Sequence, residues 1–361
     1  MTRVYVLGAG AGAAYRGSYL GETSPVAKNF FQKAMRVINI HQIRERYYED
    51  EDMTYNHIFQ FIERLWGVSR NEVSNSNLDM EEVLTLLNIE MEEDQPGRER
   101  LLKAYEEYLL LMALTFDKIL YGDLCPYHSK IAASLNPGDT IISFNYELLM
   151  DYALLRANLQ RKMWCIQDGY GISCRYLSGS IMPLHSKHQN DSGPANCAKV
   201  KLLKLHGSLN WLYCPQCGQL YAYEHSDGGG HSVVINGIAN MIQCTSQHCC
   251  NKLSRVIIPP TLMKNYQSIP FIPELWHQAR RALGFASEIV VIGYSFPTTD
   301  FRSNWMFRKA MVDNKELKKV TIVDKAEGYQ LETLLDKHKS IFRVKDVDFY
   351  PDIGAFTQTL K

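Results

Sequence analysis

The sequence predicts an α/β fold, a Rossmann-like parallel sheet with a helical insertion and a small Cys-rich, zinc-ribbon-like module. Three observations predict it. Short apolar strand candidates alternate with helix candidates through the last third of the chain, as in sheets with helices on both faces. A long early stretch has only helical periodicity, and the last five cysteines gather between residues 214 and 250.

The chain begins with a strand and a turn, which a helical block follows. Arg3–Leu7 is short and apolar, and Gly8–Ala14 consists of small residues with several glycines. Residues 25–121 then repeat apolar side chains at three- and four-residue steps, which is typical of amphipathic helices. We expect helices at Tyr55–Trp66, Met80–Met91 and Arg98–Leu120.

Strand and helix candidates alternate again after this block. The expected strands are Asp139–Phe144, Val200–Leu205, Glu288–Ile292 and Lys319–Val323. The expected helices are Tyr146–Asn158, Pro273–Leu283 and Phe301–Val312, with loops at 168–198. The predicted domains are one α/β domain formed by residues 1–24 and 122–361, a helical insertion at 25–121 and the Cys-rich module at 212–254.

Composition excludes several classes of protein. Lys and Arg number 39 and so do Asp and Glu, and a net charge of zero argues against direct nucleic-acid binding. The most apolar run, Tyr108–Phe116, is too short to span a membrane, and is either helix core or a contact surface between chains. Without an export signal, the nine cysteines favour free thiols and a metal site, so we expect a cytoplasmic protein.

A glycine-rich turn follows the first strand. Gly8 and Gly10 stand where backbone N–H groups of a tight turn can approach a pyrophosphate. The dinucleotide fingerprint of dehydrogenases is incomplete, because Ala13 occupies its third glycine position and no acidic residue ends a second strand about twenty residues later. A hydride-transferring enzyme is therefore disfavoured.

Small or polar residues also follow the later strands. Asn145 and His206 each follow an apolar strand, whereas Gly293, Ser295 and Asp324 follow the last two. Open α/β sheets bind their ligands at the carboxyl ends of strands, which makes all five candidate site residues. Simpler explanations stay open, since Asn145 could cap the next helix and His206 could be structural.

In this order along the chain, the motifs resemble those of the sirtuin-like family. They are most similar to the bacterial sirtuin-like NAD-hydrolase domains of phage-defence systems. The motifs are Gly8-Ala9-Gly10-Ala11, Phe144-Asn145-Tyr146-Glu147, Leu205-His206-Gly207-Ser208 and Gly293-Tyr294-Ser295, with Asp324 after the last strand. Gly12 replaces a frequent Ser or Thr, and Glu147 a common Asp. No GIPDFR-like segment follows the glycine loop, which puts protein deacylation in doubt.

The resemblance implies an enzyme that cleaves NAD at the nicotinamide–ribose bond, giving nicotinamide and ADP-ribose. Asn145 and His206 would be catalytic. The implied cofactor-binding residues are Gly8, Ala9, Gly10, Ala11, Gly12, Gly293, Ser295 and Asp324. A defence effector of this kind would work as a homo-oligomer or with a separately encoded defence partner. The alternatives are an NAD-dependent protein deacylase and a non-catalytic sensor or assembly module that binds NAD or ADP-ribose.

The cysteines near residues 214–250 have the spacing of metal ligands. Cys214 and Cys217 form a CPQC knuckle, and Cys244 and Cys249 supply a second, less regular pair. His248 and Cys250 compete for the second pair. Sirtuins carry a four-Cys structural zinc at this position of the chain, so the resemblance implies the same here. A degenerate ribbon without metal is the alternative.

Overall fold

The large sheet is six-stranded and parallel, with the strand order β10-β9-β8-β1-β2-β4. Its strands are β1 (Arg3–Leu7), β2 (Thr140–Ser143), β4 (Lys201–Lys204), β8 (Glu288–Ile292), β9 (Lys319–Val323) and β10 (Asp348–Tyr350). The computed structural model describes residues 2–41, 55–178, 198–224, 243–246, 249, 251–258, 269–297 and 300–360. It confirms the predicted α/β fold.

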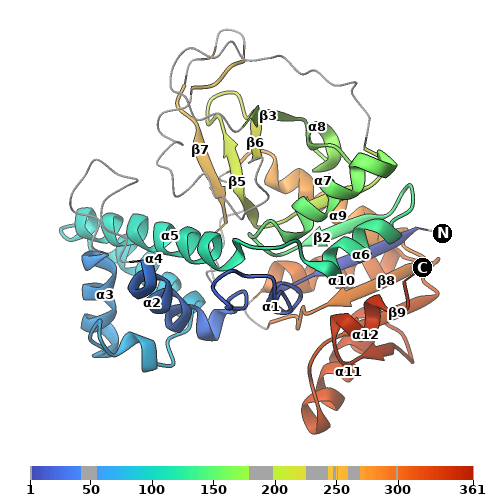
Figure 1. Cartoon of the computed structure of the whole chain (residues 1–361), viewed down its shortest axis with the longest axis horizontal. Coiled ribbons are helices and arrows are strands. Elements are labelled where there is room, and N and C mark those ends of the chain that lie inside the picture. Colours follow the sequence, from blue (N-terminus) through green and yellow to red (C-terminus); the bar gives the residue numbers. More distant parts are fainter. Residues whose placement is uncertain are drawn as a thin grey trace.

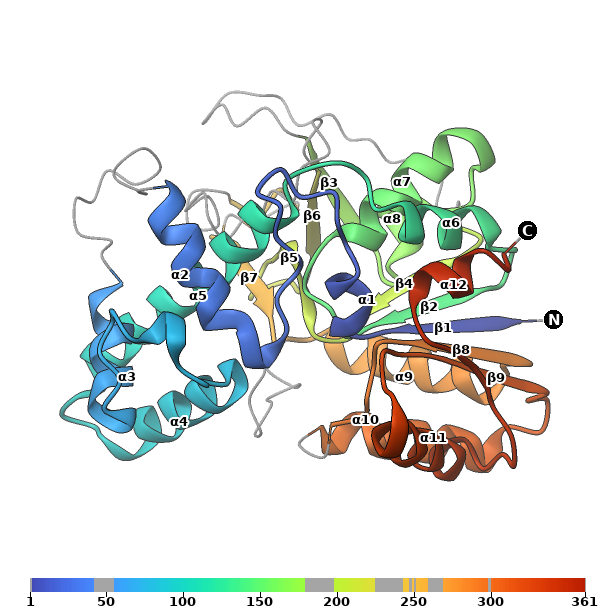
Figure 2. The same ribbon diagram turned by 60° about the horizontal axis from the view of Figure 1, so that its bottom comes forward.

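Helices cover both faces of this sheet, and Figure 2 shows them above and below the strands. One face carries α9 (Ile272–Gly284), α10 (Phe301–Asp313) and α11 (Gly328–Phe342). The other carries α1 (Ala9–Ala13), α6 (Pro126–Ser134), α7 (Leu149–Arg161), α8 (Ile166–Gly169) and α12 (Ile353–Thr357). Helices on both faces bury the sheet, which explains why its central strands are continuous apolar runs rather than alternating ones.

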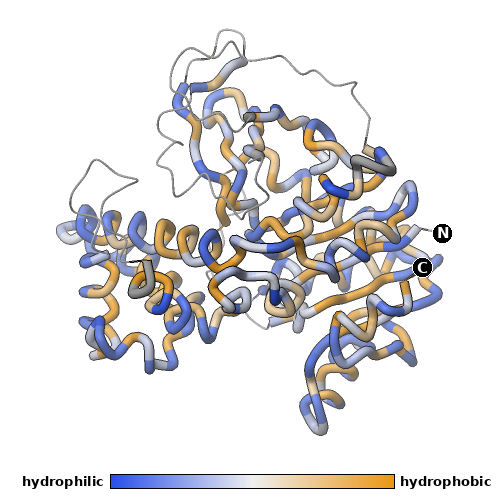
Figure 3. Tube along the Cα trace, viewed as in Figure 1, coloured by the Kyte–Doolittle hydropathy of each residue, from blue (hydrophilic) through white to orange (hydrophobic). Residues whose placement is uncertain are grey.

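The helical block lies at one end of the molecule, on the left of Figure 1. It consists of α2 (Phe30–His41), α3 (Asn56–Trp66), α4 (Met80–Glu93) and α5 (Arg98–Leu120), with short 3₁₀ turns at Ala27–Asn29 and Val73–Asn75. Asp79 caps α4 by accepting from the N–H groups of Glu81 and Glu82. Apolar residues recur between polar ones along α3 and α4, as Figure 3 shows, and the buried positions of these two helices are almost all apolar.

The apolar run Tyr108–Phe116 belongs to the core of this block. Tyr108 and Leu111 are fully buried, and the Tyr108 hydroxyl donates to the carbonyl oxygen of Met80 at 2.8 Å. The alternative of a contact surface between chains is therefore wrong for this run. No helix among the described residues is both long and apolar enough to cross a membrane.

A second, four-stranded sheet follows the order β3-β6-β5-β7 and was not expected from the sequence. Its strands are β3 (Cys174–Ser178), β5 (Gly207–Tyr213), β6 (Leu220–Glu224) and β7 (Ser254–Ile257). The expectation of loops at 168–198 is wrong for β3, which pairs in parallel with β6, and residues 179–197 lie outside the described part. The predicted domain limits at 1–24, 25–121, 122–361 and 212–254 stay predictions.

We predict that Leu111→Ala destabilises the protein by about 2–5 kcal/mol, because it removes a fully buried side chain from the helical core. Leu102, on the same helix, is 45% exposed, so Leu102→Ala is the matched control and should change stability by less than about 1 kcal/mol. Urea unfolding measures both. Equal losses in the two variants would contradict the assignment of the run to the core.

Candidate functional site

The carboxyl ends of five parallel strands lie level with one another. Leu7 of β1 pairs with Ser143 of β2 and with Ile292 of β8. Ser143 in turn pairs with Lys204 of β4, and Ile292 with Val323 of β9. Each candidate site residue follows one of these strand ends, so the sheet brings Gly8, Asn145, His206, Gly293 and Asp324 to one edge.

The turn after β1 and the turn after β8 are interlocked. The N–H of Gly8 donates to Ile292 O and the N–H of Gly10 to Gly293 O, both at 3.0 Å. A Cβ on Gly10 would lie 2.6 Å from Gly293 Cα, and one on Gly293 would lie 2.4 Å from Ala11 N. Gly293 also has a φ of +60°, so only glycine fits there.

These contacts use several N–H groups of the glycine loop. Ala11 N–H donates to Gly8 O at 3.0 Å, in addition to the bonds made by Gly8 and Gly10. Ala9 and Gly10 are exposed, whereas Ala11 and Gly12 are buried. A phosphate at this loop would therefore contact the exposed residues Ala9 and Gly10. Its hydrogen-bond donors would have to be groups other than the N–H groups of Gly8, Gly10 and Ala11.

Asn145 is buried and its amide is fixed in place. Its Nδ2 donates to Gly8 O at 2.9 Å and to Glu147 Oε1 at 3.0 Å, which ties the end of β2 to the glycine loop. The helix expected from Tyr146 begins only at Leu149. The Leu149 N–H donates to Glu147 Oε2 at 2.6 Å. Asn145 is therefore not the cap of that helix, and its two amide donors are used within the site.

A buried charge network lies beneath Asn145. The ammonium group of Lys204, only 1% exposed, donates to Glu147 O at 2.6 Å and to Asp151 Oδ2 at 2.9 Å. Tyr170 donates to the other oxygen of Asp151 at 2.6 Å. Burial raises the pKa of Glu147, and the nearby Lys204 charge opposes that rise. The network links the end of β4 to the loop that carries Asn145.

His206 lies in an aromatic enclosure and is 6% exposed. Its ring centroid is 5.3 Å from that of Phe144, 6.1 Å from Tyr146 and 6.3 Å from Trp276. The next residue, Gly207, has a φ of +82°, and a Cβ there would lie 2.1 Å from Val256 O. The turn that presents His206 therefore requires glycine at its second position.

Sequence reasoning missed part of this enclosure. Asp300 Oδ2 lies 3.8 Å from His206 Nε2 and accepts from the Tyr294 hydroxyl at 3.0 Å. Tyr294 stacks on Phe144 with centroids 4.2 Å apart and a 7° angle between the rings. The signal for Asp300 was its place before an apolar helix, where it caps α10 by accepting from Ser303 N–H. Its position beside His206 was not visible in the sequence.

Two further candidates, Ser295 and Asp324, follow the ends of β8 and β9 at the same edge. Ser295 is exposed, two residues beyond Gly293. Asp324 is half-buried, and this burial raises the pKa of its carboxyl group. Hydrogen bonds from the N–H groups of Lys325 and Ala326 oppose the rise without cancelling it. No described contact joins Asp324 to Asn145 or His206.

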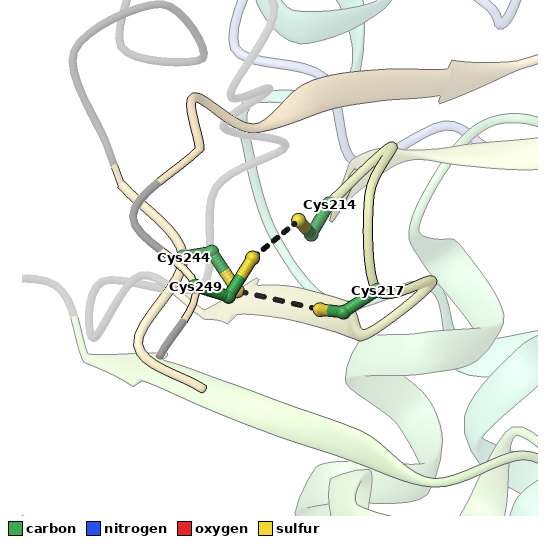
Figure 4. Close-up of side chains that lie close together, drawn as sticks. All are labelled: Cys214, Cys217, Cys244 and Cys249. Carbon is green, nitrogen blue, oxygen red and sulfur yellow. Dashed lines mark hydrogen bonds between the residues drawn. The ribbon is translucent and has the colours of Figure 1, made fainter. Parts of the chain in front are cut away.

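The four predicted cysteine ligands gather at the end of the second sheet, as Figure 4 shows. All four sulfur atoms of Cys214, Cys217, Cys244 and Cys249 lie within 4.8 Å of one another. Cys214 and Cys249 approach to 3.4 Å, and Cys217 and Cys244 to 3.5 Å. A tetrahedral zinc–thiolate centre separates its sulfurs by about 3.8 Å, so the cluster fits such a metal.

The surroundings favour a thiolate at Cys244, whereas at Cys249 the hydrogen bond from the Asn251 N–H is outweighed by Cys214 and burial, which raise the pKa to about 12. Burial raises the pKa of Cys244, but hydrogen bonds from the Tyr221 hydroxyl and from Ser246 outweigh it and lower the pKa to about 6. A thiolate is the form of cysteine that binds a metal. The competing ligands His248 and Cys250 lie outside the described residues.

Comparison with known proteins finds only remote structural similarities. No protein-family model matches the chain, and no curated protein matches it significantly. Two solved structures of Sir2 proteins are similar at 14% identity. One, from work on the mechanism and regulation of Sir2 enzymes, has a TM-score of 0.36 over 75% of this chain and 84% of its own. The other, Sir2 with EX-527, 2′-O-acetyl-ADP-ribose and a deacetylated p53 peptide, has a TM-score of 0.35 over 76% and 82%.

We predict that Gly293→Ala strongly destabilises the protein, because the new Cβ meets backbone atoms of the glycine loop. Gly328→Ala is the matched control: its φ is also positive, at +52°, but no atom lies within 4 Å of the added Cβ. The free energy of unfolding of this control should fall by about 1 kcal/mol, because only backbone strain acts there. Urea unfolding of the two variants should give a clearly larger loss for Gly293→Ala. Similar losses would contradict the interlocked turns.

Proposed function

We propose that this protein is an NAD glycohydrolase that cleaves the nicotinamide–ribose bond. The observation that carries the proposal is the shared sheet edge, where the glycine loop, Asn145 and His206 follow level strand ends. This is the edge at which open α/β sheets bind nucleotides. The resemblance of the same residues to sirtuin-like motifs supplies the choice of NAD.

The chemistry of the bond suits these two side chains. Nicotinamide carries a positive charge on its ring nitrogen while it is attached, and it leaves as a neutral molecule with the bonding electrons. The ribose carbon becomes cation-like, and water attacks it. Asn145 has both amide donors occupied, which leaves its oxygen as a fixed dipole toward the ribose or the water. His206 takes the proton that the water or a ribose hydroxyl releases.

The rest of NAD would lie along the same edge. We assign the pyrophosphate to the loop formed by Gly8, Ala9, Gly10, Ala11 and Gly12, with Gly293 and Ser295 on the neighbouring strand end. Asp324 follows the next strand along, β9, and we assign it to the ribose of the adenosine half. The reactive and the non-reactive halves of NAD would thus be bound by separate strand ends.

We predict that His206→Ala and Asn145→Ala each lower the turnover number for NAD by at least about 100-fold. Combining them should cause no greater loss than either change alone, because the two groups act as one unit. Asp324→Ala should instead raise KM. His277, an exposed histidine on α9, provides the control His277→Ala, which should keep full activity.

The assay is release of nicotinamide and ADP-ribose from NAD, with and without an acetylated peptide. Product formed only with the peptide would favour the deacylase. NAD binding by calorimetry without turnover would favour the sensor or assembly module. Undiminished cleavage by the His206 variant would remove its catalytic assignment.

The four cysteines support a structural zinc site as a separate part of the proposal. Elemental analysis should find about one zinc per chain. Cys217→Ser should lose the metal and lower the melting temperature, because the module has only a small apolar core of its own. Cys125→Ser is the control, since this buried cysteine lies outside the cluster, and it should keep the zinc. Metal-free wild-type protein with unchanged melting would contradict the site.

The cellular role that we propose is that of a cytoplasmic anti-phage defence effector, which rests on the resemblance of the motifs to those of phage-defence domains. An unrestrained NAD hydrolase would deplete the NAD of its own cell. We therefore infer that activity depends on homo-oligomer formation or on a separately encoded partner. Sedimentation of the protein during the NAD assay relates rate to assembly, and full turnover by a dilute monomer would contradict this part.

A further inference from the structure

Asp300 places a second carboxylate beside His206. It directly precedes α10, which covers the opposite face of the sheet from α7, the helix that follows Asn145. Its side chain is 3% exposed. Its Oδ2 lies 3.8 Å from His206 Nε2, within the range of a direct charge interaction. Asp300 lies outside the motifs that resemble those of the sirtuin-like family.

The structural role of Asp300 does not require its charge. It caps α10 by accepting from Ser303 N–H, and it accepts from the Tyr294 hydroxyl at 3.0 Å. Asparagine caps helices as well as aspartate does. A buried carboxylate is costly unless a positive charge compensates it. The negative charge is what Asp300 adds beside the His206 imidazole.

We propose that Asp300 is a positioning residue for His206, whose protonated state it stabilises by its charge across the 3.8 Å between Oδ2 and Nε2. This inference rests on the proposed function. When a ribose hydroxyl or the attacking water gives its proton to the imidazole, the ring becomes an imidazolium and the oxygen keeps the electron pair. Asp300 stays ionised throughout and compensates the new positive charge. With a proton on Nε2 facing Asp300, Nδ1 is the nitrogen that accepts.

The surroundings strengthen this charge pair. Phe144, Tyr146 and Trp276 form an aromatic wall around the imidazole, and a dry wall screens charges far less than water does. Other ionisable groups on the elements packed against the site are Tyr294 after β8, Glu147 before α7, Lys204 on β4 and Arg302 on α10. Lys204 is bound to Asp151 and Glu147 O, and the Arg302 guanidinium lies 5.0 Å over the Trp276 ring.

The direct test is an NMR titration of the His206 ring in the protein without NAD. Burial lowers the pKa of His206 and the Asp300 charge raises it, so Asp300→Asn should lower this pKa by about one unit or more relative to the wild type. Asp300→Glu should restore most of the difference, since it keeps the charge. Asp79→Asn is the control, because Asp79 caps α4 in the same manner far from the site.

Activity provides the second measurement. Asp300→Asn should lower kcat at neutral pH by at least about tenfold with little change in KM, and it should move the limb of the pH profile that His206 governs. Asp79→Asn should change neither. A His206 pKa that is unchanged in Asp300→Asn would overturn the proposal, and so would an unchanged pKa in Asp300→Ser, the second capping variant without charge, if Asp300→Asn fails to fold. Wild-type protein that cleaves no NAD but keeps the charge coupling would refute the proposed function instead.

Discussion

The close approach of the glycine loop to Gly293 is the constraint on which the candidate site depends. β1 lies between β8 and β2, so the turn that follows it must pass between the turns that follow its neighbours. Gly8 and Gly10 meet the backbone of Gly293 with no room for a side chain. Because Gly8 O also accepts from Asn145, the same contact sets the position of the amide. A change of a few tenths of an ångström here would reach Asn145 directly.

A buried polar network fixes the other half of this edge. Lys204 and Asp151 are almost fully buried and are bonded to each other, and Tyr170 and Glu147 O complete their hydrogen bonds. Buried ion pairs contribute little net stability, but breaking one is costly, so they hold a geometry more than they strengthen a fold. Lys204 stands two residues before His206, and one of its partners, Glu147, accepts a hydrogen bond from the Asn145 amide. The network thus keeps the two candidate catalytic groups in a constant relation.

The sequence predicted those parts of the fold that local patterns determine. Arg3–Leu7, Glu288–Ile292 and Lys319–Val323 have the expected bounds, because each is an apolar run that ends at a small or charged residue. The second sheet could not be predicted, because β5 pairs with β6 and β7 through contacts that no periodicity records. The sequence indicated Asn145 and His206 by their strand ends, whereas the place of Asp300 beside His206 follows only from how α10 packs.

The helical block is joined to the site through a shared core. Tyr146, Leu149 and Leu209 pack in the same apolar cluster as α2 to α5, and they flank Asn145 and His206 in the chain. Tyr146 O accepts from Leu209 N–H at 3.0 Å, and the Tyr146 hydroxyl donates to Ile258 O at 2.6 Å. Close-packed cores transmit small displacements because they contain few voids. A displacement within this shared core would therefore reach Tyr146, which lies between Asn145 and Glu147 in the chain.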